Sequence, residues 1–277
     1  YNSAIGCGSL QQANSGDHNN AVGLGTLFSN WGGSGNQAIG RQALACNTTG
    51  SCNEAMGYRA LYLNRTGCFN VALGPWSLYS ANSGCNNFAA GQCALYNNWG
   101  GCDNTAIGQK ALYTNTTGCN NVAIGANALC KNTTAQNNQA IGANAMLNNT
   151  TGQYNAAIGR YTLADNTDGD YNNAMGYLAL RHNIDGCHNT GIGYGALACN
   201  KTGHGNVALG NSSLYFANSG DDNFAAGQCA LYSNWGGCHN TGIGRDTLKA
   251  NSTGCYNTGI GYNALLTNTT GKYNTAI

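Results

Sequence analysis

The chain is one 17-residue unit repeated sixteen times without insertion or deletion, and this period constrains its fold more than any other feature. Each unit opens with an Asn, numbered here as position 1, from Asn2 onwards. Gly follows at position 5 and, except at Ala135, at position 15; Leu stands at position 9 and is replaced once, by Met146. The consensus is N-x-A-I-G-x-x-A-L-x-x-N-T-T-G-x-x. A unit this short cannot bury a core alone, so neighbouring units must stack as a solenoid.

Each unit holds two short apolar segments, such as Ala38-Ile39 and Ala43-Leu44, separated by turns that contain Gly. Segments this short suit strands, so the pattern predicts an all-β, parallel β-solenoid (β-roll) of sixteen 17-residue coils. Residues 41–47 could instead form one helical turn, and a mixed coil is the alternative. No linker or composition change interrupts the repeat, so we expect residues 1–277 to be one continuous array. Both ends fall within a unit, and we expect the array to belong to a longer chain or filament.

Composition excludes several classes of protein. Only 8% of residues are charged and the formal net charge is +1, which argues against binding to nucleic acid. No stretch has the apolar length of a membrane span. Glu54 is the only Glu, and a repeat without insertions supplies no long loops to build a catalytic cleft. The sequence therefore predicts a protein that is not an enzyme and needs no cofactor.

The position-1 asparagines are expected to be structural, because stacked Asn side chains can hydrogen-bond from coil to coil. The predicted ladder includes Asn36, Asn53, Asn70, Asn87, Asn104 and Asn121. Side chains alternate along a strand, so the Ala of position 3 and the Ile of position 4 face opposite ways. Either the Ile column is an apolar stripe able to bury against a second chain, or the turn at position 5 brings both columns inside. The sequence leaves these two alternatives open.

Aromatic residues recur in two columns. Position 10 carries the consecutive residues Tyr62, Tyr79, Tyr96 and Tyr113, which predict a stacked ladder that serves as a sugar platform, a packing face or simply a strand-forming column. Trp31, Trp99 and Trp235 replace a Thr of the usual N-T-T-G turn, at spacings of 68 and 136 residues, which are multiples of four coils. We interpret these Trp residues as candidate contacts for assembly or for sugars.

Fourteen cysteines without a C-x-x-C motif indicate an oxidising, extracellular compartment. Cysteines that share a column in adjacent coils lie within disulfide range, which makes Cys68–Cys85, Cys102–Cys119 and Cys238–Cys255 candidate disulfides. Asn-x-Ser/Thr triplets recur at position 12 and are either turn chemistry or a row of glycosylation sites. The glycosylation candidates are Asn47, Asn64, Asn115, Asn132, Asn149, Asn200, Asn251 and Asn268.

Metal binding has one weak candidate. Asp165, Asp168, Asp170 and Asp185 form an oxygen-rich cluster that could hold Ca²⁺, although a solvated turn is the alternative. The cluster lacks the EF-hand spacing, since Ala164 occupies the place of its first ligand.

The recurring N-x-A-I-G, as in Asn104–Gly108 and Asn121–Gly125, resembles the head repeats of trimeric autotransporter adhesins and similar arrays in phage tail-fibre-like proteins. The resemblance implies a parallel β-roll with one apolar strand face turned toward partner chains. The chain differs from that family in its longer repeat, its cysteines and the absence of a heptad stalk. We expect an extracellular fibre or rod whose partner is itself, with an adhesin or glycan-binding head as the alternative. Ice binding through the Thr pairs, such as Thr48-Thr49, is a third and weaker hypothesis.

Overall fold

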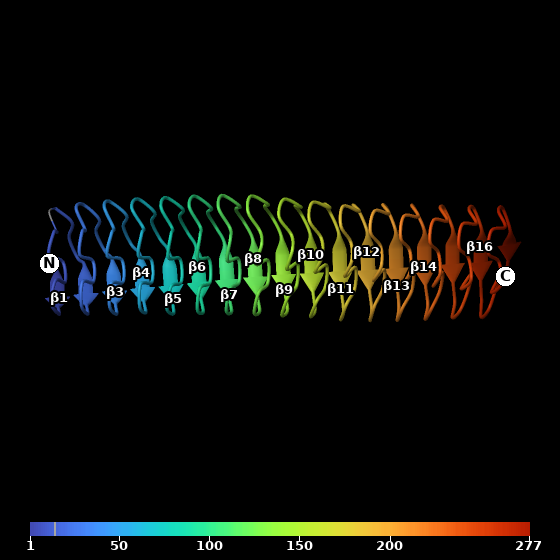
Figure 1. The fold of residues 1–277 in the computed structure, drawn as a ribbon, viewed down its shortest axis with the longest axis horizontal. Coiled ribbons are helices and arrows are strands. Elements are labelled where there is room, and N and C mark those ends of the chain that lie inside the picture. The colour runs from blue at the N-terminus through green and yellow to red at the C-terminus, as the bar shows by residue number, and fades with distance from the viewer. Residues whose placement is uncertain (14) are drawn as a thin grey trace. The chain divides into compact units, whose positions relative to one another are not determined.

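The computed structural model describes residues 1–13 and 15–277, which form two compact units, 1–137 and 138–277, each described by itself. Both units are all-β, and in each one short parallel strands follow one another along the chain, one strand per repeat (Figure 1). No helix occurs in the described residues. Each unit is therefore a parallel β-solenoid with a 17-residue coil, which confirms the predicted fold class. A single array of residues 1–277 stays a prediction.

The strands of each unit pair in one register. In residues 1–137 they are β1 (Ser3–Ile5), β2 (Asn20–Val22), β3 (Gln37–Ile39), β4 (Glu54–Met56), β5 (Val71–Leu73), β6 (Phe88–Ala90), β7 (Thr105–Ile107) and β8 (Val122–Ile124). In residues 138–277 they are β9 (Gln139–Ile141), β10 (Ala156–Ile158), β11 (Asn173–Met175), β12 (Thr190–Ile192), β13 (Val207–Leu209), β14 (Phe224–Ala226), β15 (Thr241–Ile243), β16 (Thr258–Ile260) and β17 (Thr275–Ala276). Partners are 17 residues apart, as in Ala38 opposite Ala55, so every repeat position forms a column.

The rest of each coil is built from turns, because its backbone repeatedly enters the left-handed region. In the coil of residues 36–52, φ is 58° at Gln42, 50° at Leu44 and 57° at Cys52. Two such residues within positions 6–11 rule out a right-handed helical turn and also a second strand there. The mixed-coil alternative is therefore wrong, and the second apolar segment is a turn rather than a strand.

The interior of a coil contains both apolar side chains and side-chain amides. Ala38, Ala43 and Leu44, at positions 3, 8 and 9, are fully buried, and so are Asn36 and Asn47 at positions 1 and 12. Small Ala side chains leave the core thin, so much of its stability must come from hydrogen bonds between coils. Because each buried amide needs a partner, the two Asn columns determine how coils stack.

Glycine is required at two positions for two reasons. Gly40, at position 5, has a φ of 123°, and a Cβ there would lie 2.8 Å from the carbonyl oxygen of Gly57 in the next coil. Gly152, at position 15, has no positive φ, but its Cβ would lie 2.5 Å from the oxygen of Gly169. Strain and close approach therefore explain the two Gly columns.

The strand face separates the two apolar columns. Ala38 is fully buried, whereas Ile39 is 43% exposed, and the same alternation holds in nearly every strand. The outward column is called here the position-4 stripe: Ile5, Val22, Ile39, Met56, Leu73, Ala90, Ile107 and Ile124 in the first unit, and Ile141, Ile158, Met175, Ile192, Leu209, Ala226, Ile243 and Ile260 in the second. The prediction of an exposed apolar stripe is confirmed, and the alternative that buries both columns is wrong.

Candidate functional site

The position-1 asparagines form the ladder that the sequence predicted. Asn36 is typical: its Oδ1 accepts hydrogen bonds from the backbone N–H of Asn53 at 3.0 Å and from Asn53 Nδ2 at 3.1 Å. Its Nδ2 donates to Asn19 Oδ1 at 3.2 Å and to the carbonyl of Gly50 at 2.9 Å. Within each unit, the side chain thus accepts an N–H that the strand pairing does not use, which ties one coil to the next.

The position-12 asparagines form a second buried ladder. Asn47 Nδ2 donates to Asn30 Oδ1 at 2.6 Å and to the carbonyl of Gly50 at 2.8 Å, and Asn64 Nδ2 donates to Asn47 Oδ1 at 2.8 Å. A glycan is attached through this same nitrogen, which here is buried and fully used. The glycosylation interpretation is therefore corrected: the candidates that are buried structural amides are Asn47, Asn64, Asn115, Asn132, Asn149, Asn200 and Asn251, and the partly buried Asn268 bonds in the same way.

From Asn30 onwards, this second ladder is broken once in each unit. Ala81 takes position 12 after Asn64, and Ala217 takes it after Asn200. Among buried side-chain oxygens of the described residues, only Asn64 Oδ1 and Asn200 Oδ1 lack a hydrogen-bond partner. Each break therefore leaves one buried acceptor unsatisfied, at the same place in the repeat.

Position 16 carries a third hydrogen-bonded column, of which only the cysteines were identified from the sequence. In the first unit, the N–H of Cys68 donates to Cys85 Sγ at 3.2 Å, that of Cys85 to Cys102 Sγ at 3.2 Å, and that of Cys102 to Cys119 Sγ at 3.2 Å. Ser51 Oγ likewise accepts a hydrogen bond from the backbone N–H of Ser34, in the preceding coil, at 3.0 Å. The shared property is a short side chain with an acceptor atom near the backbone.

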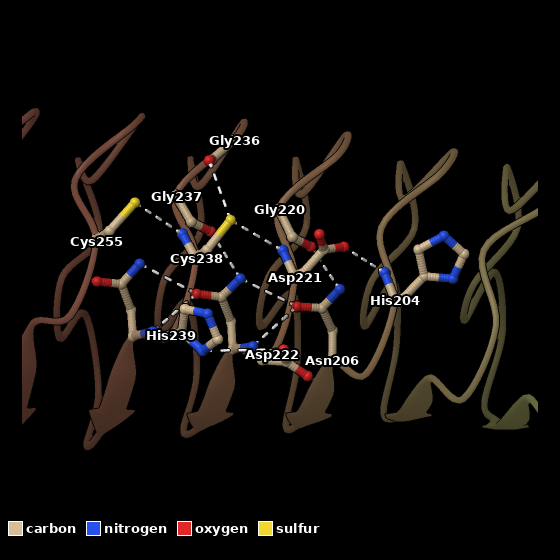
Figure 2. A network of polar contacts seen from close by, with 12 residues as sticks. His204, Asn206, Gly220, Asp221, Asp222, Gly236, Gly237, Cys238, His239 and Cys255 are labelled. Carbon is tan, nitrogen blue, oxygen red and sulfur yellow. Dashed lines mark hydrogen bonds and ion pairs between the residues drawn. The ribbon is translucent and has the colours of Figure 1, made fainter.

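Figure 2 shows the same column in the second unit, where the residue type changes from coil to coil. The N–H of His204 donates to Asp221 Oδ1 at 2.8 Å, that of Asp221 to Cys238 Sγ at 3.4 Å, and that of Cys238 to Cys255 Sγ at 3.3 Å. The thiol of Cys238 also donates to the carbonyl of Gly236 at 3.6 Å. A carboxylate oxygen and a thiol sulfur therefore each accept a backbone N–H from the preceding coil at this position.

All fourteen cysteines are free thiols in this structure. The disulfides suggested for Cys68–Cys85, Cys102–Cys119 and Cys238–Cys255 are not formed, and the column that suggested them is explained by the position-16 hydrogen bonds. Desolvation by burial raises the pKa of the Cys85 and Cys238 thiols, which favours the protonated form that donates to a carbonyl.

The tyrosines of position 10 stack as predicted. Ring centroids are 5.3 Å apart for Tyr62–Tyr79, 5.0 Å for Tyr79–Tyr96 and 5.1 Å for Tyr96–Tyr113, and the planes differ by 19° at most. Desolvation by burial, and then the neighbouring tyrosines, raise the pKa of Tyr96. The ring faces cover one another, so the ladder presents mainly ring edges to solvent. Position 17 carries further stacks that the sequence analysis missed, such as Tyr154–Tyr171–His188 at 4.9 and 5.0 Å.

The three tryptophans of the N-W-G-G turns lie at the surface. Trp31, Trp99 and Trp235 are 60%, 61% and 58% exposed. Trp99 lines a pocket with Leu63, Arg65, Ser80 and Asn82, and Trp235 lines another with Cys199, Lys201, Phe216 and Asn218. Sequence reasoning found the tryptophans but not the pockets, because the lining residues come from three coils and are 17 residues apart.

The four aspartates do not come together as a calcium site. Asp165 Oδ2 pairs with His182 Nδ1 at 2.7 Å, and Asp170 Oδ1 accepts the N–H of Gln153 at 2.6 Å as part of the position-16 column. Asp168 accepts from the hydroxyl of Thr167. Across residues 1–13 and 15–277, no three His, Cys, Asp or Glu residues are arranged to hold a metal. The described residues therefore do not support the Ca²⁺ candidate.

No helix in the described part of the chain is long and apolar enough to cross a membrane. Comparison with known proteins does not assign the chain to a family: no family model matches it, and no curated protein matches it significantly.

Proposed function

We propose that the chain is a structural repeat protein that forms a rigid extracellular rod and associates with further copies of itself through its strand face. The observation that supports this function is the position-4 stripe, a continuous column of apolar side chains in each unit, most of them exposed and the others half-buried; Met56, for example, is 54% exposed. Contiguous exposed apolar patches on soluble proteins mark interaction surfaces.

A second copy of the same chain is the partner that fits this face. Glu54 is the only charged residue in the seventeen strands of the described residues, so two such faces can meet without burying many charges. Both copies share one coil spacing, and the side chains of one stripe can therefore fit between those of the other at every coil. Sheets that meet in this way pack about 10 Å apart.

The extracellular part of this proposal is supported by the resemblance to adhesin and tail-fibre repeats. The cysteine content supports it less, because all fourteen cysteines are free thiols in this structure, and the seven at position 16 have a structural explanation that needs no oxidising compartment. Titration of native, non-reduced material with a thiol reagent under denaturing conditions separates the two cases. Fourteen reactive thiols fit the free cysteines of this structure, whereas fewer would restore the disulfide interpretation and the oxidising compartment.

Self-association is tested by placing charge on the stripe. We expect the wild-type chain to form filaments or multimers by electron microscopy and analytical ultracentrifugation. The double variant Ile107→Lys with Ile158→Lys places a cation on the stripe in each unit and should dissociate them. The double variant Thr117→Lys with Thr151→Lys, which adds the same charge on an exposed turn of each unit, is the matched control and should leave assembly intact.

A wild-type chain that stays monomeric at every concentration would refute the proposed function. So would assembly that survives the double variant. Circular dichroism on each variant separates loss of assembly from loss of fold.

Sugar binding is the second candidate function. The exposed tryptophans are better candidates for stacking on a sugar than the tyrosine ladder, whose ring faces are covered. Ice binding has less support, because Thr hydroxyls of position 13 are already engaged: Thr48 Oγ1 donates to the carbonyl of Arg65 at 2.6 Å and Thr116 Oγ1 to that of Thr133 at 2.9 Å.

A further inference from the structure

The two surface pockets are copies of one arrangement. In the first unit, Arg65, Asn82 and Trp99 occupy position 13 of three successive coils; in the second, Lys201, Asn218 and Trp235 do so 136 residues later. Position 11 of the first two coils completes each lining, with Leu63 and Ser80 in one pocket and Cys199 and Phe216 in the other. The pockets have similar volumes, about 240 and 230 Å³.

The backbone holds both pockets in the same geometry. The N–H of Arg65 donates to the carbonyl of Asn82 at 3.1 Å, and the N–H of Lys201 donates to that of Asn218 at 3.0 Å. The carbonyls of Trp99 and Trp235 likewise accept an N–H from the coil before at 3.0 Å. What changes between the copies is the position-11 lining, whereas a cation, an amide and an indole are retained in the same order.

Both pockets lie over the breaks in the position-12 ladder. In the middle coil of each, Ala81 or Ala217 stands where the buried Asn belongs, and the Asn occurs one residue later, at the pocket surface. The displacement leaves Asn64 Oδ1 and Asn200 Oδ1 buried without a donor, in the coil that also supplies the cation. An unsatisfied buried acceptor destabilises the fold, and a local rule broken at such a cost typically marks a functional site.

The side chains of the pocket are available to a ligand. No carboxylate of the described residues lies within ion-pair distance of Arg65 or Lys201. Trp99 and Trp235 expose more than half of their surface. An indole face packs against the C–H face of a sugar ring, an amide hydrogen-bonds hydroxyls, and a cation pairs with an anionic substituent. The volume is smaller than the roughly 300–1,000 Å³ of drug-sized sites, so it suits one ring.

We propose that each unit carries one binding site for an anionic saccharide, in which a single pyranose ring lies against Trp99 or Trp235. Arg65 or Lys201 pairs with its negatively charged substituent, and Asn82 or Asn218 hydrogen-bonds its hydroxyls. The change from Arg to Lys between the two sites keeps the charge and loses the planar fork, so the first site should bind a carboxylate more tightly than the second.

Calorimetric titration of the intact chain with a short oligosaccharide that contains glucuronic acid tests the proposal. We expect two sites per chain, and no binding of a neutral glucose oligomer of equal length. A sulfated oligomer that competes for the same sites would support the shared anionic chemistry and identify the substituent. Arg65→Gln should lower the affinity of the first site about tenfold or more and leave the second unchanged, and Arg65→Gln with Lys201→Gln should lower the affinity of both sites by that factor.

Matched controls separate the pockets from a general effect of charge or aromatic surface. Trp99→Ala with Trp235→Ala should abolish binding, whereas Trp31→Ala, in the same column but lining neither pocket, should not. Arg41→Gln removes an exposed cation elsewhere and should also leave binding unchanged.

Three results would overturn the proposal. These are no binding of either acidic oligosaccharide, equal binding of the neutral oligomer, and binding that survives the double substitutions in folded protein. The result is independent of self-association, which is measured on the same variants by ultracentrifugation.

Discussion

Substitution of Ala81 by Asn should stabilise the chain, because it repairs the ladder break in the first unit. The new Nδ2 would donate to Asn64 Oδ1, now buried without a partner, and to the carbonyl of Gly84. The new Oδ1 would accept from Asn98 Nδ2, which here donates to the carbonyl of Gly101 at 2.7 Å. Intact steps of the ladder make these same bonds at 2.6–2.8 Å, as at Asn47.

The magnitude follows from the bonds gained. Three new hydrogen bonds at about 1 kcal/mol each give about 3 kcal/mol. Ordering one side chain offsets part of this, about 1 kcal/mol. The free energy of unfolding should therefore rise by about 2 kcal/mol, measured by chemical denaturation with native-state hydrogen exchange to locate the gain in the coils around the break.

A control uses the same substitution at a buried Ala that faces no unsatisfied oxygen. Ala94→Asn buries an amide without ladder partners and should destabilise the chain. Ala217→Asn should repeat the gain in the second unit. If both Ala81→Asn and Ala217→Asn are neutral or destabilising, the reasoning about the unsatisfied Asn64 oxygen is refuted.

Four further effects follow from the hydrogen-bond columns. Asn36→Ala removes four bonds and leaves the N–H of Asn53 without its acceptor, so unfolding free energy should fall by about 4 kcal/mol, and that amide should exchange faster. Gly57→Ala should cost more than about 2 kcal/mol, because φ is 139° and a Cβ would lie 2.7 Å from the next carbonyl; a soluble, equally stable variant would contradict this. Cys102→Val should cost about 1–2 kcal/mol by removing the acceptor for the N–H of Cys85, whereas Cys102→Ser should restore it in a thermal melt. Burial raises the pKa of the Cys85 thiol above its ordinary 9.0, so the unfolded chain loses that proton first; stability present below about pH 9 should decline as pH rises further, with a shallower decline in Cys85→Ser.

The fold could be predicted from the sequence because the 17-residue period is invariant. An uninterrupted Asn column needs partners, and stacking gives each Asn the same partner in the next coil. The direction of the Ile column could not be predicted, because alternation along a strand says that Ala38 and Ile39 differ but not which one faces inward. The left-handed backbone conformation of Leu44 could not be predicted either, since Leu disfavours that conformation and only the surrounding coils hold it there.

The functional columns were partly hidden by residue type. Asn47-Thr48-Thr49 fits a turn, a glycosylation site and a buried ladder equally well from sequence, and only burial distinguishes them. Position 16 was interpreted through its cysteines, although the occurrence of Ser51 and Asp221 in the same column is the signal for a shared acceptor atom. Comparing residues by the atom they place near the backbone, rather than by class, would have found this column.

The asparagine ladders have a direction. Wherever a bond between two side-chain amides joins neighbouring coils, the Oδ1 accepts from the following coil and the Nδ2 donates to the preceding one, as at Asn36 and Asn53. Each amide carries a dipole of about 3.5 D, and aligned dipoles add along the stack as they do in a helix. At a face that ends such a stack, the ladder amides thus present either donors or oxygens. Two faces of the same kind place like groups of the ladder opposite one another, so the ladders favour contact between ends from head to tail, the arrangement that extends a linear chain instead of closing a symmetric pair.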